Sequence, residues 1–130
     1  MANPNIVSVT SIVGGNAAWA LSNTVTTTLM TVAADVIVKI NSILVTNIHA
    51  SNAATVSIDV NGMGSGTTGV TVTGPLATCR LASTMNVPAD DSLVLIDKPI
   101  YLMEDDILRG GASAASVLEL FASYEVINDA

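Results

Sequence analysis

The chain has 130 residues, a formal net charge of −7 and an apolar fraction of 50%, and only 12% of its residues carry a formal charge. One domain over residues 1–130 is expected, large enough to bury a core without disulfides or metals. Four Lys and Arg residues are too few to neutralise a nucleic-acid backbone or to dock on an anionic membrane, so we expect neither partner. A mean hydropathy of +0.60 excludes a disordered chain.

Cysteine and histidine each occur once, as Cys79 and His49. An intrachain disulfide is therefore excluded, and so is a zinc site of the usual Cys/His type within one chain. The first residues carry no basic segment followed by an apolar run, so we expect no signal peptide. No window approaches 18 uninterrupted apolar residues, so we also expect no transmembrane helix.

Strands are favoured by composition, because β-branched side chains fit pleated sheets and Val, Ile and Thr supply 41 residues against four aromatic ones. Alternation of apolar and polar residues is clearest over 55–61 and 117–126, where Phe121 falls on the more exposed face. In chain order, the sequence predicts strands over residues 6–13, 24–32, 36–48, 55–61, 69–73, 76–86, 92–97, 100–108 and 117–126.

Glycine and proline clusters separate these runs, and we interpret them as turns. The main ones are Gly14-Gly15-Asn16, residues 62–69 and Gly110-Gly111. No segment of 10 to 12 residues has helical periodicity, although residues 77–85 would also suit one helical turn. The pattern predicts an all-β fold, an antiparallel β-sandwich of jelly-roll type with eight or nine strands.

No constellation of side chains predicts catalysis, so we expect neither an enzyme nor a cofactor site. His49 stands at a predicted strand end without a neighbouring acid, and Cys79 is in phase with apolar residues, which is typical of a small buried side chain. The glycine-rich segment 62–69 precedes a predicted strand, whereas phosphate-binding loops open a helix. We interpret it as a hairpin loop.

Two acidic clusters, Asp90-Asp91 and Glu104-Asp105-Asp106, are the remaining candidates for chemistry. Neighbouring residues of an extended chain point to opposite faces, so spacing alone does not bring these carboxylates together. We interpret both clusters as solvated turns and expect no metal site, with Ca²⁺ or Mg²⁺ binding as the alternative.

Charge is distributed unevenly, since the first 34 residues carry none. Monomeric soluble proteins normally mix charges over their whole surface, so we interpret residues near 1–32 as an assembly arm that contacts other subunits. The alternative is a neutral, solvated, hydroxyl-rich face. Trp19 is either an aromatic anchor of this contact or a core residue. The predicted assembly contacts are Trp19, Val25, Leu29 and Met30.

Several segments carry a resemblance to a known family. They are VPADDSLVLIDK (87–98), PIYLMEDDIL (99–108), ASA (112–114), SYEVI (123–127), MANPNIV (1–7) and VKINSILVTN (38–47). Together they span most of the chain, and the sequence resembles a family of small virion structural proteins from tailed phages of marine bacteria, cyanophages among them.

This resemblance implies a structural component of a phage particle, most directly a capsid decoration (cement) protein on the capsid surface, made in the cytoplasm of the bacterial host. Its partners would be copies of itself, in a homo-oligomer for which a trimer is one option, and the major capsid protein or other virion proteins. The alternatives are a tail or fibre-associated subunit and a carbohydrate-binding or adhesion module. The second needs exposed aromatic residues, which are few here.

Overall fold

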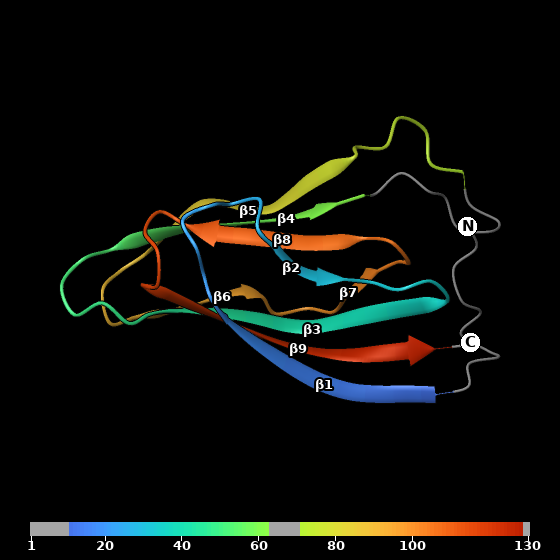
Figure 1. Cartoon of the computed structure of the whole chain (residues 1–130), viewed down its shortest axis with the longest axis horizontal. Helices are drawn as coiled ribbons and strands as arrows, with labels where there is room; N and C mark the ends of the chain where they lie inside the picture. Colours follow the sequence, from blue (N-terminus) through green and yellow to red (C-terminus); the bar gives the residue numbers. More distant parts are fainter. Residues whose placement is uncertain (1–10, 63–70, 129–130) are drawn as a thin grey trace.

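The computed structural model describes residues 11–62 and 71–128, which form nine strands and no helix (Figure 1). The all-β prediction is confirmed, and residues 78–87 form a strand with no helical turn. The strands are β1 (Ser11–Ala20), β2 (Thr28–Thr31), β3 (Val36–Asn47), β4 (Ala54–Asn61), β5 (Thr78–Val87), β6 (Ser92–Ile96), β7 (Ile100–Leu102), β8 (Ile107–Ala112) and β9 (Leu118–Asn128).

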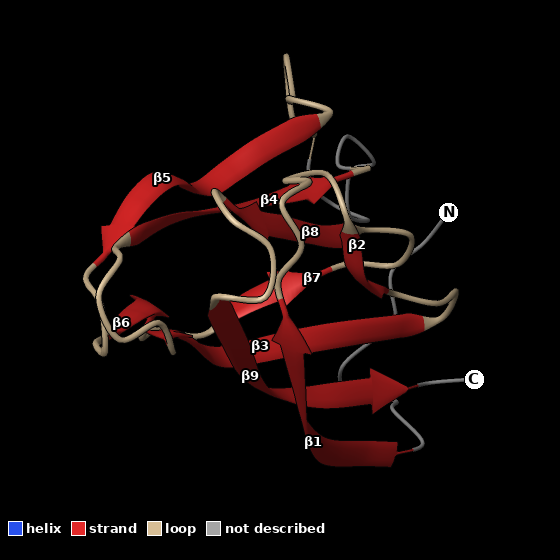
Figure 2. Cartoon of the chain, turned by 60° about the vertical axis from the view of Figure 1, so that its left-hand side comes forward, coloured by secondary structure: helices blue, strands red, loops and turns tan. Residues whose placement is uncertain are grey.

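These strands make two antiparallel sheets, visible as separate layers in Figure 2. The first sheet has the order β1-β9-β3-β6, and β7 also pairs with β3. Because β9 occupies the other side of β3, the strands β6 and β7 follow one another along the same edge of β3. The second sheet has the order β2-β8-β4-β5.

Buried aliphatic side chains from both sheets form one hydrophobic cluster between them. The alternation predicted for residues 117–126 is confirmed over residues 118–122, since Leu118, Leu120 and Ala122 are buried while Phe121 is 43% exposed. Residues 123–126 are half-buried on both faces of the strand. Burying one leucine side chain stabilises the fold by roughly 2 kcal/mol. The largest fully buried members of the cluster are Leu21, Ile40, Ile43, Ile58, Leu102, Leu108, Leu118 and Leu120.

Strand β4 differs from the prediction on its polar face. Ser57 and Asp59 are buried, although alternation placed them toward solvent. Each is hydrogen-bonded, which offsets its loss of hydration: Ser57 Oγ accepts from the Thr84 backbone N–H at 2.9 Å, and Arg109 donates to both carboxylate oxygens of Asp59 at 2.8 and 2.9 Å. The Asp59–Arg109 pair joins β4 to its neighbour β8.

Three other strand predictions need correction. Residues 100–108 form two strands, β7 and β8, separated by a turn, and the predicted strand 24–32 is reduced to β2. Residues 71–73 are not a strand, and residues 69–70 of the same prediction lie outside the described residues. The prediction over 6–13 also begins outside them.

Both glycine pairs predicted as turns lie within strands, so these two predictions are wrong. Gly14-Gly15-Asn16 is part of β1, and Gly110-Gly111 is part of β8. In β8 the missing side chains make room for other backbone: a Cβ atom on Gly111 would lie 2.5 Å from the Thr24 carbonyl oxygen, and one on Gly110 would lie 3.0 Å from that of Ser57. Glycine here permits close approach of two chain segments.

Candidate functional site

His49 is engaged in holding its own loop. Its Nδ1 accepts hydrogen bonds from the backbone N–H groups of Ser51 at 3.1 Å and Asn52 at 3.0 Å. The imidazole lines a hollow of about 490 Å³ together with small or uncharged residues. Cys79 is half-buried on β5, so the prediction of a buried thiol holds only in part.

The interpretation of residues 104–106 as a solvated turn is wrong for two of the three acids, because Glu104 and Asp106 are buried. Glu104 Oε2 accepts from the Asp35 backbone N–H at 2.9 Å, and Asp106 Oδ2 accepts from that of Met103 at 2.9 Å. Burial raises the pKa of Asp106 above its ordinary value, the bond from Met103 lowers it, and the charge of Asp105 raises it further.

The turn that contains these acids is hydrogen-bonded to the segment that follows β2. The Asp105 backbone N–H donates to the Val32 carbonyl at 2.9 Å, and the Val32 N–H donates to the Asp106 carbonyl at 3.0 Å. The carboxylates of Glu104 and Asp106 also stabilise this turn before β8, because each accepts a hydrogen bond from a backbone N–H group. Asp90 and Asp91 are exposed, as predicted. Among residues 11–62 and 71–128, no three His, Cys, Asp or Glu side chains gather as they would around a metal ion.

The predicted assembly arm is integrated into the fold wherever it is described. Strand β1 pairs with β9 along its whole length, and Leu21 is buried in the core. The following connection is bonded to two other elements: the Leu21 N–H donates to the Leu118 carbonyl at 2.9 Å, and the Ala112 N–H donates to the Ser22 carbonyl at 2.8 Å. Residues 1–10 of the predicted arm lie outside the described residues.

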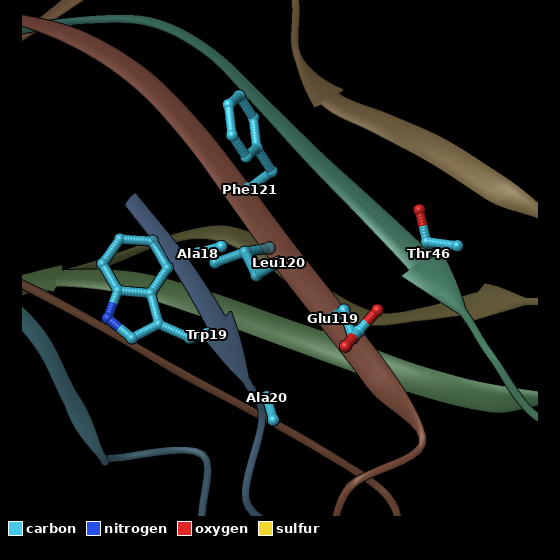
Figure 3. Close-up of a pocket in the computed structure, with 7 residues that line it drawn as sticks. All are labelled: Ala18, Trp19, Ala20, Thr46, Glu119, Leu120 and Phe121. Carbon is cyan, nitrogen blue, oxygen red and sulfur yellow. The ribbon is translucent and has the colours of Figure 1, made fainter. Parts of the chain in front are cut away.

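Trp19 packs on the core and also reaches an open hollow, so its role as an anchor of a subunit contact stays a prediction. It is half-buried, packs against the core cluster and lies opposite Leu120 on β9. It also lines an open hollow of about 350 Å³ on the β1 side of the first sheet, which Figure 3 shows with Phe121 projecting from the neighbouring strand. The complete lining is Ala18, Trp19, Ala20, Thr46, Glu119, Leu120 and Phe121.

The other three predicted contacts do not join Trp19 in this hollow. Val25 is 38% exposed in the connection between β1 and β2, and Leu29 packs half-buried against the core. Met30 lines a separate apolar hollow of about 270 Å³, where it lies with Tyr124 and Val126 of β9. The four predicted contacts therefore lie on different local surfaces.

Two exposed apolar residues of β1 were missed by sequence reasoning. Ile12 and Val13 are each 58% exposed. Successive strand residues point to opposite faces, so the beginning of β1 presents apolar side chains to solvent on both faces of the sheet. The signal was an Ile-Val pair inside an uncharged segment, and it was obscured because β1 was expected to end at residue 13.

An apolar row also crosses the outer face of the first sheet. The strand registers place Ala18 opposite Phe121, Phe121 opposite Leu44, and Leu44 opposite Val94. Phe121 and Val94 are both substantially exposed. One neighbouring row consists of Asn16, Ser123 and Ser42, and the other of Ala20, Glu119, Thr46 and Ser92.

Comparisons with protein-family models, with curated proteins and with solved structures find no match to this chain. Within the described parts of the chain there is no helix of the length and apolar character needed to cross a membrane.

Proposed function

We propose that this protein is a structural component of a phage particle, a capsid decoration (cement) protein that stabilises the shell through contacts with copies of itself and with the shell. The observation that carries the proposal is the uncharged β1 edge, where Ile12 and Val13 expose apolar side chains on both faces. Neutral groups cost less to dehydrate than ions, so a partner can cover this edge more cheaply than a charged surface.

We further infer that the two sheets form one jelly-roll sandwich. Counting β6 and β7 as one interrupted strand gives eight strands, with β1-β9-β3-β6 facing β2-β8-β4-β5. This order is that of two interlocked Greek keys, an architecture common to viral capsid proteins and lectins. Architecture alone does not assign function, so the proposed function rests on the uncharged β1 edge.

The resemblance of segments 38–47, 87–98 and 99–108 to small phage virion proteins supports the same proposal. The protein then acts in the virion, on the capsid surface, without catalysis and without a cofactor. Its partners are other copies of the chain, as a homo-oligomer, and the major capsid protein or other virion proteins, with no role in binding nucleic acid or membranes.

The number of copies per purified particle tests this proposal. Quantitative mass spectrometry of phage particles should find hundreds of copies for a decoration protein. A few copies would instead assign the chain to the tail or fibre, and absence from particles would overturn both assignments.

A carbohydrate-binding or adhesion module is the candidate from a different class, and exposed Tyr101 is the observation that favours it. The side chain is 48% exposed, and β7 pairs it with Lys39 of β3. Stacking on a sugar ring requires such an exposed aromatic surface. A glycan array that finds a ligand lost in Tyr101→Ala would favour this function, and an array without any ligand would remove it.

Trp19→Ala tests whether the β1 side forms the subunit contact. We expect the variant to remain folded by circular dichroism and to lose incorporation into particles, because the ring lines an open hollow as well as the core. Val72→Ala is the control for loss of an apolar surface side chain elsewhere, since Val72 is 54% exposed and lies outside β1. An unfolded Trp19→Ala variant would assign the ring to the core, and normal incorporation would contradict the contact.

A further inference from the structure

The two longest edge strands among the described residues, β1 and β5, are protected to very different degrees. Both have ten residues and each is terminal in its sheet. β5 carries Arg80, its register with β4 shifts twice, and Thr84 has a φ of 47°. Charges and irregular backbone of this kind prevent a sheet edge from pairing with another chain.

β1 has none of these protections. It pairs with β9 over ten consecutive residues without a register shift, and it contains neither a charged residue nor a proline. Within the described residues it has no partner on its other side, as its place at the lower border of Figure 1 shows. Every second residue of a regular edge directs its N–H and C=O groups outward, over a length of roughly 33 Å for ten residues.

We propose that β1 of one copy pairs antiparallel with β1 of a second copy, so that the first sheet continues through a twofold dimer. This inference rests on the proposed function only in requiring that the chain associates with itself. An antiparallel edge is self-complementary under a twofold axis, since each donor of one copy meets the matching acceptor of the other.

Charge favours a second copy at this edge over contact elsewhere. Each copy carries a net charge of −7, so most faces of two copies repel one another. β1 and the connection to β2 carry no charge, and the first ionisable side chain after them is Asp35. Pairing here also covers part of the exposed surface of Ile12 and Val13 on the two faces of the sheet.

The symmetry restricts the register. The twofold axis that relates two antiparallel neighbouring strands is perpendicular to the sheet. A residue on the outer face of the sheet in one copy therefore lies opposite a residue on the outer face in the other copy. Gly14, Asn16 and Ala18 share the face of Phe121, and all three are exposed. Overlap of the two strands is greatest when the axis passes near Gly15 or Asn16, the middle of β1.

Disulfide crosslinking tests this geometry in a Cys79→Ser background. Gly14→Cys, Asn16→Cys and Ala18→Cys are oxidised singly and in pairwise mixtures, which together cover every axis position from residue 14 to 18. Paired residues have Cα atoms about 4.5 to 5.5 Å apart, a distance that a disulfide can bridge. We expect one combination to form covalent dimers readily and the control Asn86→Cys, on the β5 edge, to remain monomeric. No dimer from any combination would overturn the proposal.

A charge placed on the edge gives a second test, by sedimentation velocity over a concentration series. Asn16→Asp with Ala18→Asp should weaken the dimer by at least about tenfold, because four carboxylates are brought into the contact between two copies that already carry −7 each, while Asn86→Asp should not. If the β1 double variant and the residue 86 variant both self-associate as the wild type does, pairing through the β1 edge is overturned, while self-association through another surface stands. A wild-type chain that is monomeric or trimeric at every concentration would overturn edge pairing, while the copy number per particle would still decide the proposed function.

Discussion

Strands β1 and β8 each contain a Gly-Gly pair, but the surroundings of Gly14 in β1 differ from those of Gly110 and Gly111 in β8. Gly110 and Gly111 lie in the interior of the second sheet, where backbone atoms occupy the space that side chains would need. Gly14 lies at the edge of the first sheet, and a Cβ atom there would meet nothing within 4 Å. In β8 glycine is required by packing, whereas at Gly14 it is only tolerated.

This difference shows that glycine can occupy a strand position for different structural reasons. In β8 it lets the connection after β1 cross close to the sheet, where the Gly110 N–H donates to the Thr27 carbonyl at 3.0 Å. At Gly14 no neighbouring atom occupies the space of a side chain, so this position would accept a larger residue.

Gly111→Ala should have the largest effect. The added methyl group would lie 2.5 Å from the Thr24 carbonyl oxygen, so either β8 or the connection must shift. We expect the free energy of unfolding to fall by about 3 kcal/mol, measured by urea denaturation. A loss well below 1 kcal/mol would mean that the connection is free to move away, which would remove the contrast between the two glycine pairs.

Asp106→Asn tests the turn that precedes β8. The raised pKa means that the folded state binds this proton more tightly than the unfolded state, so the contribution of Asp106 to stability is greatest below the ordinary pKa of 3.8 and is lost as the pH rises through the raised value. The amide oxygen of Asn still accepts from the Met103 N–H. We expect the variant to have the higher Tm at about pH 7 and no advantage at about pH 3.

The same measurement has a clear contrary outcome. An Asp106→Asn variant less stable than wild type at neutral pH would show that the charged hydrogen bond to Met103 outweighs the burial of the carboxylate. The start of β8 would then be fixed by an ionised side chain.

Gly14→Ala should have the smallest effect and the opposite sign. Ala loses less backbone freedom than Gly on folding, and Gly14 is exposed with space for a methyl group, so a gain of about 0.5 kcal/mol is expected in urea denaturation. Gly15→Ala is the matched control, because its Cβ atom would lie 3.0 Å from the Tyr124 ring and should cancel this gain. Destabilisation by Gly14→Ala would contradict a merely tolerated glycine.

Much of the fold could be predicted from alternation and turn residues. Strands β3, β4, β6 and β9 agree with the predicted ranges to within two residues at each end, because their β-branched runs end at clear breaks. The C-terminal ends of β1 and β8 were misplaced because glycine pairs were taken as turns, and the turn between β7 and β8 was missed. Whether glycine breaks a strand or admits a neighbouring segment depends on tertiary contacts, such as that between Gly111 and Thr24, which local sequence does not contain.

Of the four predicted contacts, Trp19 alone lies in the hollow beside β1, while Met30 lines another hollow. The absence of charge over the first 34 residues pointed to the β1 side, and the exposed position of Phe121 followed from alternation. The exposure of Val13, which shares a face with the half-buried Trp19, depends on how far the second sheet covers β1. The burial of Glu104 and Asp106 depends on the partner turn around Asp35, which is distant in sequence.

The place of β9 between β1 and β3 sets the order in which the molecule can be completed during synthesis. Until residues 118–128 leave the ribosome, β1 and β3 have no strand to join them, and the first sheet cannot close. Contacts this distant in sequence form slowly. Nascent chains therefore carry the unprotected β1 without its native neighbour. Chaperone binding during translation, or rapid dilution when the protein is refolded, should improve the yield of native protein.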